Sequence, residues 1–124
     1  CDALDIGKHF KKGTVEEIVM QMFLEHLTYK NVVKLLNICW ELLKEKGKIE
    51  IEVPSFKRGK AYEFTHKSIY SEDTFGEIDN EEMCRECGLK SFKVVKLNTN
   101  TKGNIYCILE KAKDYTIKLR KKIK

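Results

Sequence analysis

The feature that most constrains the fold is a helical pattern held between two strand patterns. From Thr28, a residue type that caps helix N-termini, an amphipathic pattern continues to Gly47, carried by Val32, Leu35, Leu36, Cys39, Leu42 and Leu43, with Lys44 and Lys46 in its last turn. The apolar run at residues 15–24 is typical of a strand buried on both faces, and residues 49–53 alternate until Pro54. Two strands joined by such a helix form a right-handed crossover in a parallel sheet, so we predict an α/β fold.

The second half of the chain predicts a loop, a short helix and a hairpin. Residues 55–76 are polar, aromatic and too long for a plain connection, so we interpret them as a variable loop that carries recognition. A helix is expected from about Asp79, with Glu82 completing a capping box, to Gly88. Two apolar runs around a turn at residues 98–103 then predict an antiparallel hairpin.

Size and composition indicate one globular domain. The chain has 124 residues, of which 42% are hydrophobic and 35% charged. Its apolar runs fall far short of the roughly 20 residues that cross a bilayer, so we expect no membrane contact, and the N-terminus lacks the pattern of a signal peptide. Because no initiator methionine is present, we expect the chain to be a piece of a longer gene product.

Cysteine usage favours a reducing, cytoplasmic compartment. The count of five is odd, and Cys39, Cys87 and Cys107 lie within apolar patterns where a reduced cysteine packs as a small hydrophobe. Cys84 and Cys87 have the spacing of half a zinc site, but no second pair or nearby histidine pair completes four ligands. We therefore expect core packing at these positions and no metal site.

The net charge of +5 is concentrated near the C-terminus, in a basic tail at residues 113–124. Such a tail can bind phosphates through counterion release. Since no aromatic ladder for base stacking accompanies it, we interpret it as a solvated terminus and do not expect nucleic-acid binding.

Short motifs follow one another in a fixed order along the chain. They are Asp2-Ala3, Gly13-Thr14-Val15-Glu16, Leu24-Glu25-His26-Leu27, Lys46-Gly47-Lys48, Val53-Pro54 and the helix-glycine-strand segment at residues 83–92. Each motif is weak alone, but their ordered combination resembles the C-terminal half of a class I S-adenosylmethionine-dependent methyltransferase domain of the type 11-like kind. The resemblance covers essentially the whole chain. It implies a partial Rossmann-like sheet, with parallel strands followed by the terminal antiparallel hairpin.

The resemblance also implies S-adenosylmethionine as cofactor and assigns residues to it. In this family an acidic turn contacts the adenine, and Asp2 and Ala3 match that turn, with Asp5 as a substitute. Gln21 matches the residue at the end of the next strand that contacts the methionine portion, and Met20 flanks it. This placement agrees with ligand binding at the carboxyl ends of strands in open α/β sheets. Without the resemblance, we would interpret Asp2 as a charged residue in solvent and Met20 as a residue packed in the core.

Catalytic and acceptor-binding residues are less sharply marked. His26 is a candidate general base, although capping or packing at the strand-to-helix junction is the alternative. In the variable loop, Tyr62, His66 and Tyr70 are our candidates for acceptor recognition.

The chain departs from the family at the cofactor. Family members carry a glycine-rich loop after their first strand and an acidic residue ending their second, and neither element occurs in this sequence. The strand at residues 15–24 would then lie at a sheet edge, which favours pairing with another segment. We expect a second copy of the chain, a partner or a preceding segment to cover it.

Three functions remain open at this point. The first is methyl transfer from S-adenosylmethionine to an unknown acceptor, as part of a longer chain or assembly. The second is a catalytically inactive methyltransferase-like binding module, and the missing glycine loop favours it. The third is nucleic-acid binding through the basic tail.

Overall fold

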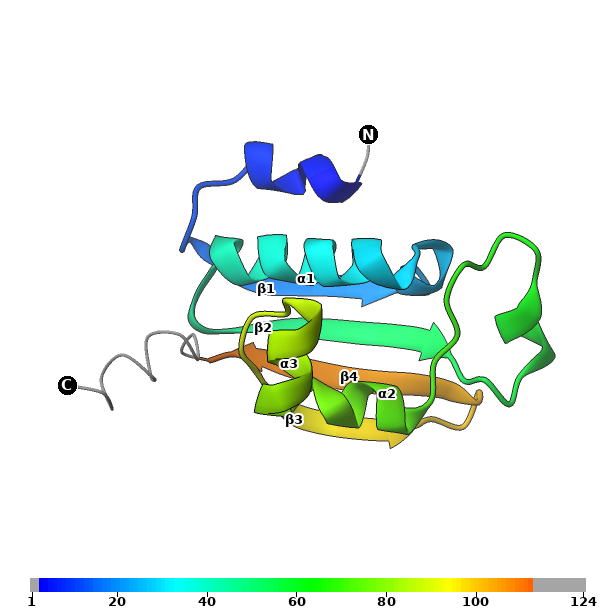
Figure 1. Cartoon of the computed structure of the whole chain (residues 1–124). Helices are drawn as coiled ribbons and strands as arrows, with labels where there is room; N and C mark the ends of the chain where they lie inside the picture. Colours follow the sequence, from blue (N-terminus) through cyan, green and yellow to red (C-terminus); the bar gives the residue numbers. More distant parts are fainter. Residues whose placement is uncertain (1–2, 113–124) are drawn as a thin grey trace.

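The computed structural model describes residues 3–112 of the chain (Figure 1). The described residues form a four-stranded sheet in the order β1-β2-β4-β3, with three α-helices in front of it in Figure 1. In chain order the elements are η1 (Ala3–Lys8), β1 (Val15–Gln21), η2 (Leu24–His26), α1 (Tyr29–Leu42), β2 (Leu43–Pro54), η3 (Gly59–Tyr62), α2 (Glu72–Gly76), η4 (Glu77–Asp79), α3 (Glu81–Cys87), β3 (Phe92–Thr99) and β4 (Asn104–Lys111), where η denotes a 3-10 helix.

The predicted crossover unit is confirmed. β1 and β2 pair in parallel, and α1 connects them. The Thr28 hydroxyl accepts a hydrogen bond from the Asn31 amide at 3.3 Å, which satisfies one of the free amides at the helix start.

The prediction that this helix continues to Gly47 is wrong, because α1 ends at Leu42. Leu43 is already in β2, where it is fully buried and pairs with Val15. The backbone then turns through Lys46, whose φ is 63°, and such a conformation cannot continue a helix. The pairing of Leu43 with Val15 in the sheet therefore ends the helix.

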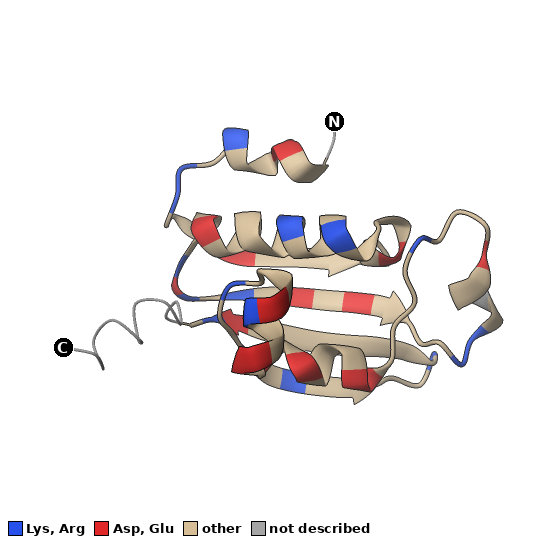
Figure 2. Ribbon diagram, viewed as in Figure 1, with Lys and Arg blue, Asp and Glu red and all other residues tan. Residues whose placement is uncertain are grey.

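The core lies between the helices and one face of the sheet. Ile49, Ile51 and Val53 of β2 are fully buried on that face, together with Leu35 and Cys39 of α1. On the other face of β2, Glu50 and Glu52 are only partly buried. Figure 2 shows acidic positions in red along this strand. The alternation of apolar and acidic residues in this strand thus indicates a sheet with one covered face.

β1 is an edge strand of the described sheet. The expectation of burial on both faces is wrong, because only Met20 of its seven residues is buried and Val19 is 53% exposed. The strand also stops at Gln21 rather than Leu24, which belongs to η2. An apolar run alone does not distinguish a central strand from an edge strand, since only the neighbours in the sheet decide its cover.

The second half follows the predicted order with shifted boundaries. The last α-helix begins with Asn80 rather than Asp79 as its cap, and the Asn80 side-chain oxygen accepts from the Met83 amide at 3.1 Å. Gly88 ends that helix in the left-handed region, at φ 80°. β3 and β4 form the predicted antiparallel hairpin. The loop at residues 55–76 contains η3 and α2.

The cysteines are placed differently from the sequence expectation. Cys39 and Cys107 are buried as expected, but in α3 it is Cys84 that is buried and Cys87 that is exposed. All four are free thiols. Among residues 3–112, no helix combines the length and the apolar character needed to cross a bilayer.

Candidate functional site

The carboxyl end of β1 forms one wall of an apolar groove of about 330 Å³. The groove brings together three of the predicted cofactor residues, Ala3 of η1 and Met20 and Gln21 of β1. Ile6 and Phe23 also line it. Its volume is within the range of about 300–1,000 Å³ that is usual for ligand pockets. Predicted residue Asp2 lies outside the described residues.

The residues of this groove fit part of S-adenosylmethionine. A mostly apolar wall suits the adenine ring, and Gln21, exposed at the strand end, offers an amide that can bind a polar group. Met20 is 7% exposed and contributes mainly to the wall. Within residues 3–112, no glycine-rich turn follows a buried strand.

A tight turn separates the groove from the next segment of the chain. Met22 has φ 52°, an uncommon value for a residue with a side chain, and its amide donates to the Glu52 carbonyl at 2.7 Å. This turn redirects the chain from β1 into η2. It therefore places Glu25 and His26 at the carboxyl end of the parallel strands.

The loop at residues 55–76 is fastened to that same segment by hydrogen bonds. The amides of Lys67 and Ser68 donate to the Glu25 carbonyl at 2.7 Å and 3.2 Å. The Ser68 hydroxyl donates to the Leu24 carbonyl at 3.1 Å. These hydrogen bonds hold the loop beside η2, although the two segments are about 40 positions apart in the sequence. They also satisfy buried backbone carbonyl groups of η2.

The three predicted acceptor-binding residues occupy different environments. Tyr62 is 58% exposed at the end of η3, and His66 is partly buried. Tyr70 is only 2% exposed, stacks on Phe75 with ring centroids 5.3 Å apart and accepts a hydrogen bond from Ser68. Burial raises the pKa of the Tyr70 phenol well above its usual value. As placed, Tyr70 supports the loop and is not presented on an acceptor surface.

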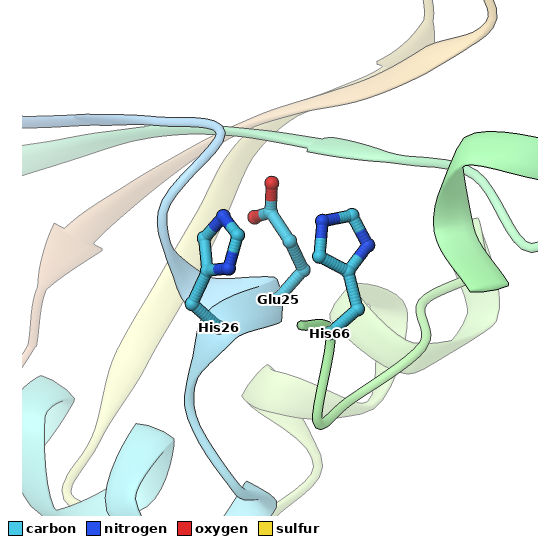
Figure 3. A group of neighbouring side chains, drawn as sticks. All are labelled: Glu25, His26 and His66. Carbon is cyan, nitrogen blue, oxygen red and sulfur yellow. The ribbon is translucent and has the colours of Figure 1, made fainter. Parts of the chain in front are cut away.

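His26 and His66 meet at this junction, with Glu25 beside them. Their imidazole rings contact edge to face, with centroids 4.7 Å apart (Figure 3). Ligand-capable atoms of Glu25, His26 and His66 all lie within 4.8 Å of one another. The Glu25 side chain is buried, with 1% exposed, whereas His26 is exposed and His66 is half-buried. His26, the candidate general base, therefore has access to solvent at the carboxyl end of the sheet.

Sequence reasoning missed this grouping and the part that Glu25 takes in it. In the sequence, Glu25 appears only as one position of the Leu24-Glu25-His26-Leu27 motif. The pair Cys84 and Cys87 is the one place where the spacing of residues suggested metal ligands. The available signal was an adjacent Glu25-His26 pair after a predicted strand and one further histidine in the variable loop. Only the hydrogen bonds to Lys67 and Ser68 show that the two segments meet.

A second groove, of about 420 Å³, lies between α1 and α3. Tyr29, Lys30 and Lys34 line it on one side and Cys87 on the other. It holds none of the predicted site residues.

Comparison of the fold with solved structures gives consistent matches. A SAM-dependent methyltransferase from Archaeoglobus fulgidus superposes with a TM-score of 0.63 at 17% identity, over 90% of this chain and 66% of that one. A SAM-dependent methyltransferase from Methanosarcina mazei gives 0.56 at 13% identity, over 90% and 65%. This chain has part of the methyltransferase fold.

A third methyltransferase structure includes the cofactor. A Thermus thermophilus protein, provisionally described as a DNA modification methylase and complexed with S-adenosyl-L-methionine, superposes with a TM-score of 0.52 at 14% identity, over 89% of this chain and 50% of that one. The chain thus spans between half and two thirds of these methyltransferases. No protein-family model and no curated protein matches the sequence.

The methyltransferase fold agrees with the sheet described above. The parallel pair β1-β2 followed by the antiparallel hairpin β3-β4 is the arrangement that the sequence resemblance implied. The structure therefore supports the α/β fold class with a partial sheet.

Proposed function

We propose that this chain takes part in S-adenosylmethionine-dependent methyl transfer to an unidentified acceptor, as part of a longer chain or an assembly. The observation that carries the proposal is the groove at the carboxyl end of β1, where Ala3, Met20 and Gln21 lie together on a methyltransferase fold. Open α/β sheets bind their ligands at this end of the strands. Four free thiols among the described residues favour a cytoplasmic location in this proposal.

In this proposal Ala3, Met20 and Gln21, with Asp2 of the preceding turn, hold the adenine and methionine portions of the cofactor. When bound, S-adenosylmethionine supplies an activated methyl group. The chain's own residues then act by orientation, since methyl transfer depends mainly on holding the acceptor in line with that group. His26 is the candidate base for the acceptor proton.

The acceptor surface is proposed on the loop at residues 55–76. His66 of this loop lies against His26, in the segment that follows β1. Tyr62 and Phe64 of the same loop are exposed. Exposed aromatic side chains of this kind supply contact area for recognition.

A titration calorimetry experiment with S-adenosylhomocysteine tests the proposal. Binding to the chain should weaken about threefold to tenfold in Gln21→Ala, since a hydrogen bond contributes about 0.5–1.5 kcal/mol. Asp2→Ala should weaken it as well. Glu17→Ala is the matched control, because Glu17 is exposed on the same strand and does not line the groove. Equal affinities for the Gln21 and Glu17 variants would contradict the assigned site.

The alternative function is a catalytically inactive methyltransferase-like binding module. It is favoured by the lack of a glycine-rich turn within residues 3–112 and by the open edge of β1. It predicts no binding of S-adenosylmethionine or S-adenosylhomocysteine by the isolated chain, together with a stable complex with a partner protein.

A further inference from the structure

We infer that Glu25, His26 and His66 form a binding site for a divalent transition-metal ion of the zinc class. The inference does not depend on the proposed methyl transfer. It starts from the chemistry of the three side chains, since two imidazoles and one carboxylate are a ligand set that zinc accepts in proteins. Their ligand-capable atoms lie within 4.8 Å of one another, so small side-chain rotations bring all three within the bond lengths of about 2.0–2.2 Å that zinc requires.

The Glu25 carboxylate points to a ligand by itself. Glu25 is 1% exposed, and its Oε1 atom is buried without a hydrogen-bond partner among the described residues. Figure 3 shows this carboxylate beside the two imidazole rings. A buried polar atom without a partner is unfavourable, and a cation bound by these three groups would satisfy it.

The second nitrogen of His66 is already oriented for such a role. His66 Nδ1 lies 3.4 Å from the Ala61 carbonyl oxygen, which can accept a hydrogen bond from an N–H at this nitrogen. That contact favours the tautomer in which Nε2 has its lone pair free. Metal-binding histidines commonly hold their other ring nitrogen on a backbone carbonyl in this way, which fixes the direction of the ring.

The backbone also holds the ligands in place. Glu25 and His26 belong to η2, while His66 precedes Lys67 and Ser68, whose amides donate to the Glu25 carbonyl. The site is therefore assembled by the folded loop. Because His26 is exposed, an ion bound here would keep an open position toward solvent, where water or an oxygen ligand can bind.

A zinc titration of the full chain, prepared without a polyhistidine tag and freed of metal, tests the site. We expect one Zn²⁺ per chain by elemental analysis, a rise in the unfolding temperature on adding Zn²⁺, and visible absorption bands with Co²⁺. Glu25→Gln and His66→Ala should each weaken Zn²⁺ binding by at least about tenfold, in line with losses seen even for residues that only support metal ligands. His26→Ala serves as a further variant, because its exposed side chain can be removed with little effect on folding.

Two matched controls separate this site from others on the chain. His9→Ala removes the remaining histidine, which is exposed outside the cluster, and Cys87→Ser removes the exposed thiol of the cysteine pair. Both should bind Zn²⁺ as the unchanged chain does. No zinc binding by the folded chain, binding unaffected by His26→Ala, or binding lost with Cys87→Ser would overturn the inference. All these measurements are made without S-adenosylmethionine, so their outcome is independent of the cofactor experiment.

Discussion

Burial controls the chemistry of the cysteine side chains. It raises the pKa of Cys39 and of Cys107 to about 12, and that of Cys84 to about 11, because the thiolate loses its hydration. Cys87 is exposed on α3. The thiolate is the form that reacts with alkylating reagents. Three of the four described cysteines are therefore protected in two ways, because their thiols are buried from the reagent and because they stay protonated.

Iodoacetamide labelling should therefore be selective. At about pH 8 in the folded chain we expect Cys87 to react, whereas Cys39, Cys84 and Cys107 should react only after denaturation. Peptide mapping by mass spectrometry measures the extent at each position. Labelling of Cys39 at the rate of Cys87 in the folded state would contradict the described burial.

The same pKa shifts predict a loss of stability in alkali. The folded-state pKa of Cys39 is about 12 against an ordinary value of 9.0, so folding favours the protonated thiol. Its contribution is fully present below about pH 9 and is lost as the pH rises toward 12. Urea unfolding across this range should show a falling free energy of unfolding, and a shallower fall for Cys39→Val, which cannot ionise.

At the scale of elements, the start of β2 is irregular where it pairs with β1. Between Val15 and Glu17 of β1 the register on β2 moves from Leu43 to Lys48, so β2 bulges there. A side-chain carbon built on Gly47 would lie 2.9 Å from the Lys44 carbonyl oxygen. The bulge therefore requires glycine at this position, where the sequence motif suggested only a turn after a helix.

Gly47→Ala tests this close approach. We expect a loss of about 1–3 kcal/mol in the free energy of unfolding, measured by urea denaturation, because the backbone must shift to admit the methyl group. Gly59→Ala is the control, since no atom lies within 4 Å of the added carbon there. Equal stability of the two variants would contradict the described bulge.

At the scale of the whole molecule, the sheet has one covered face and an open edge. The core lies between β2, β4 and the helices, whereas β1 has no neighbour on its outer side within the described residues. Exposed Val19 lies on that strand. Unpaired strand edges tend to pair with other chains. We propose that a second copy of the chain or a partner chain covers this edge.

Light scattering coupled to size-exclusion chromatography tests that proposal. We expect the apparent mass to rise with concentration and to return to that of a monomer in Val19→Lys, because an edge lysine opposes pairing. Val95→Lys, on the opposite edge strand β3, is the control. A monomer at all concentrations whose β1 amides exchange rapidly with solvent would count against any cover of this edge.

The sequence by itself determined the order and type of the main elements. Local signals carry this information: the Thr28 cap, the helical spacing after it, the alternation in residues 49–53 and the left-handed Gly88 each act over a few neighbouring residues. The groove residues Ala3, Met20 and Gln21 could be named because they follow the order of a known fold, and Asp2 and the tail at residues 113–124 stay predictions outside the described residues.

Only the tertiary structure decided where α1 ends, which of the two α3 cysteines is buried and which side chains meet Glu25. These outcomes depend on contacts between segments far apart in the chain. His66 reaches Glu25 and His26 because the loop folds back and the Lys67 and Ser68 amides bind the Glu25 carbonyl. No local pattern encodes that pairing, since its free energy arises from the burial and hydrogen bonding of both segments together.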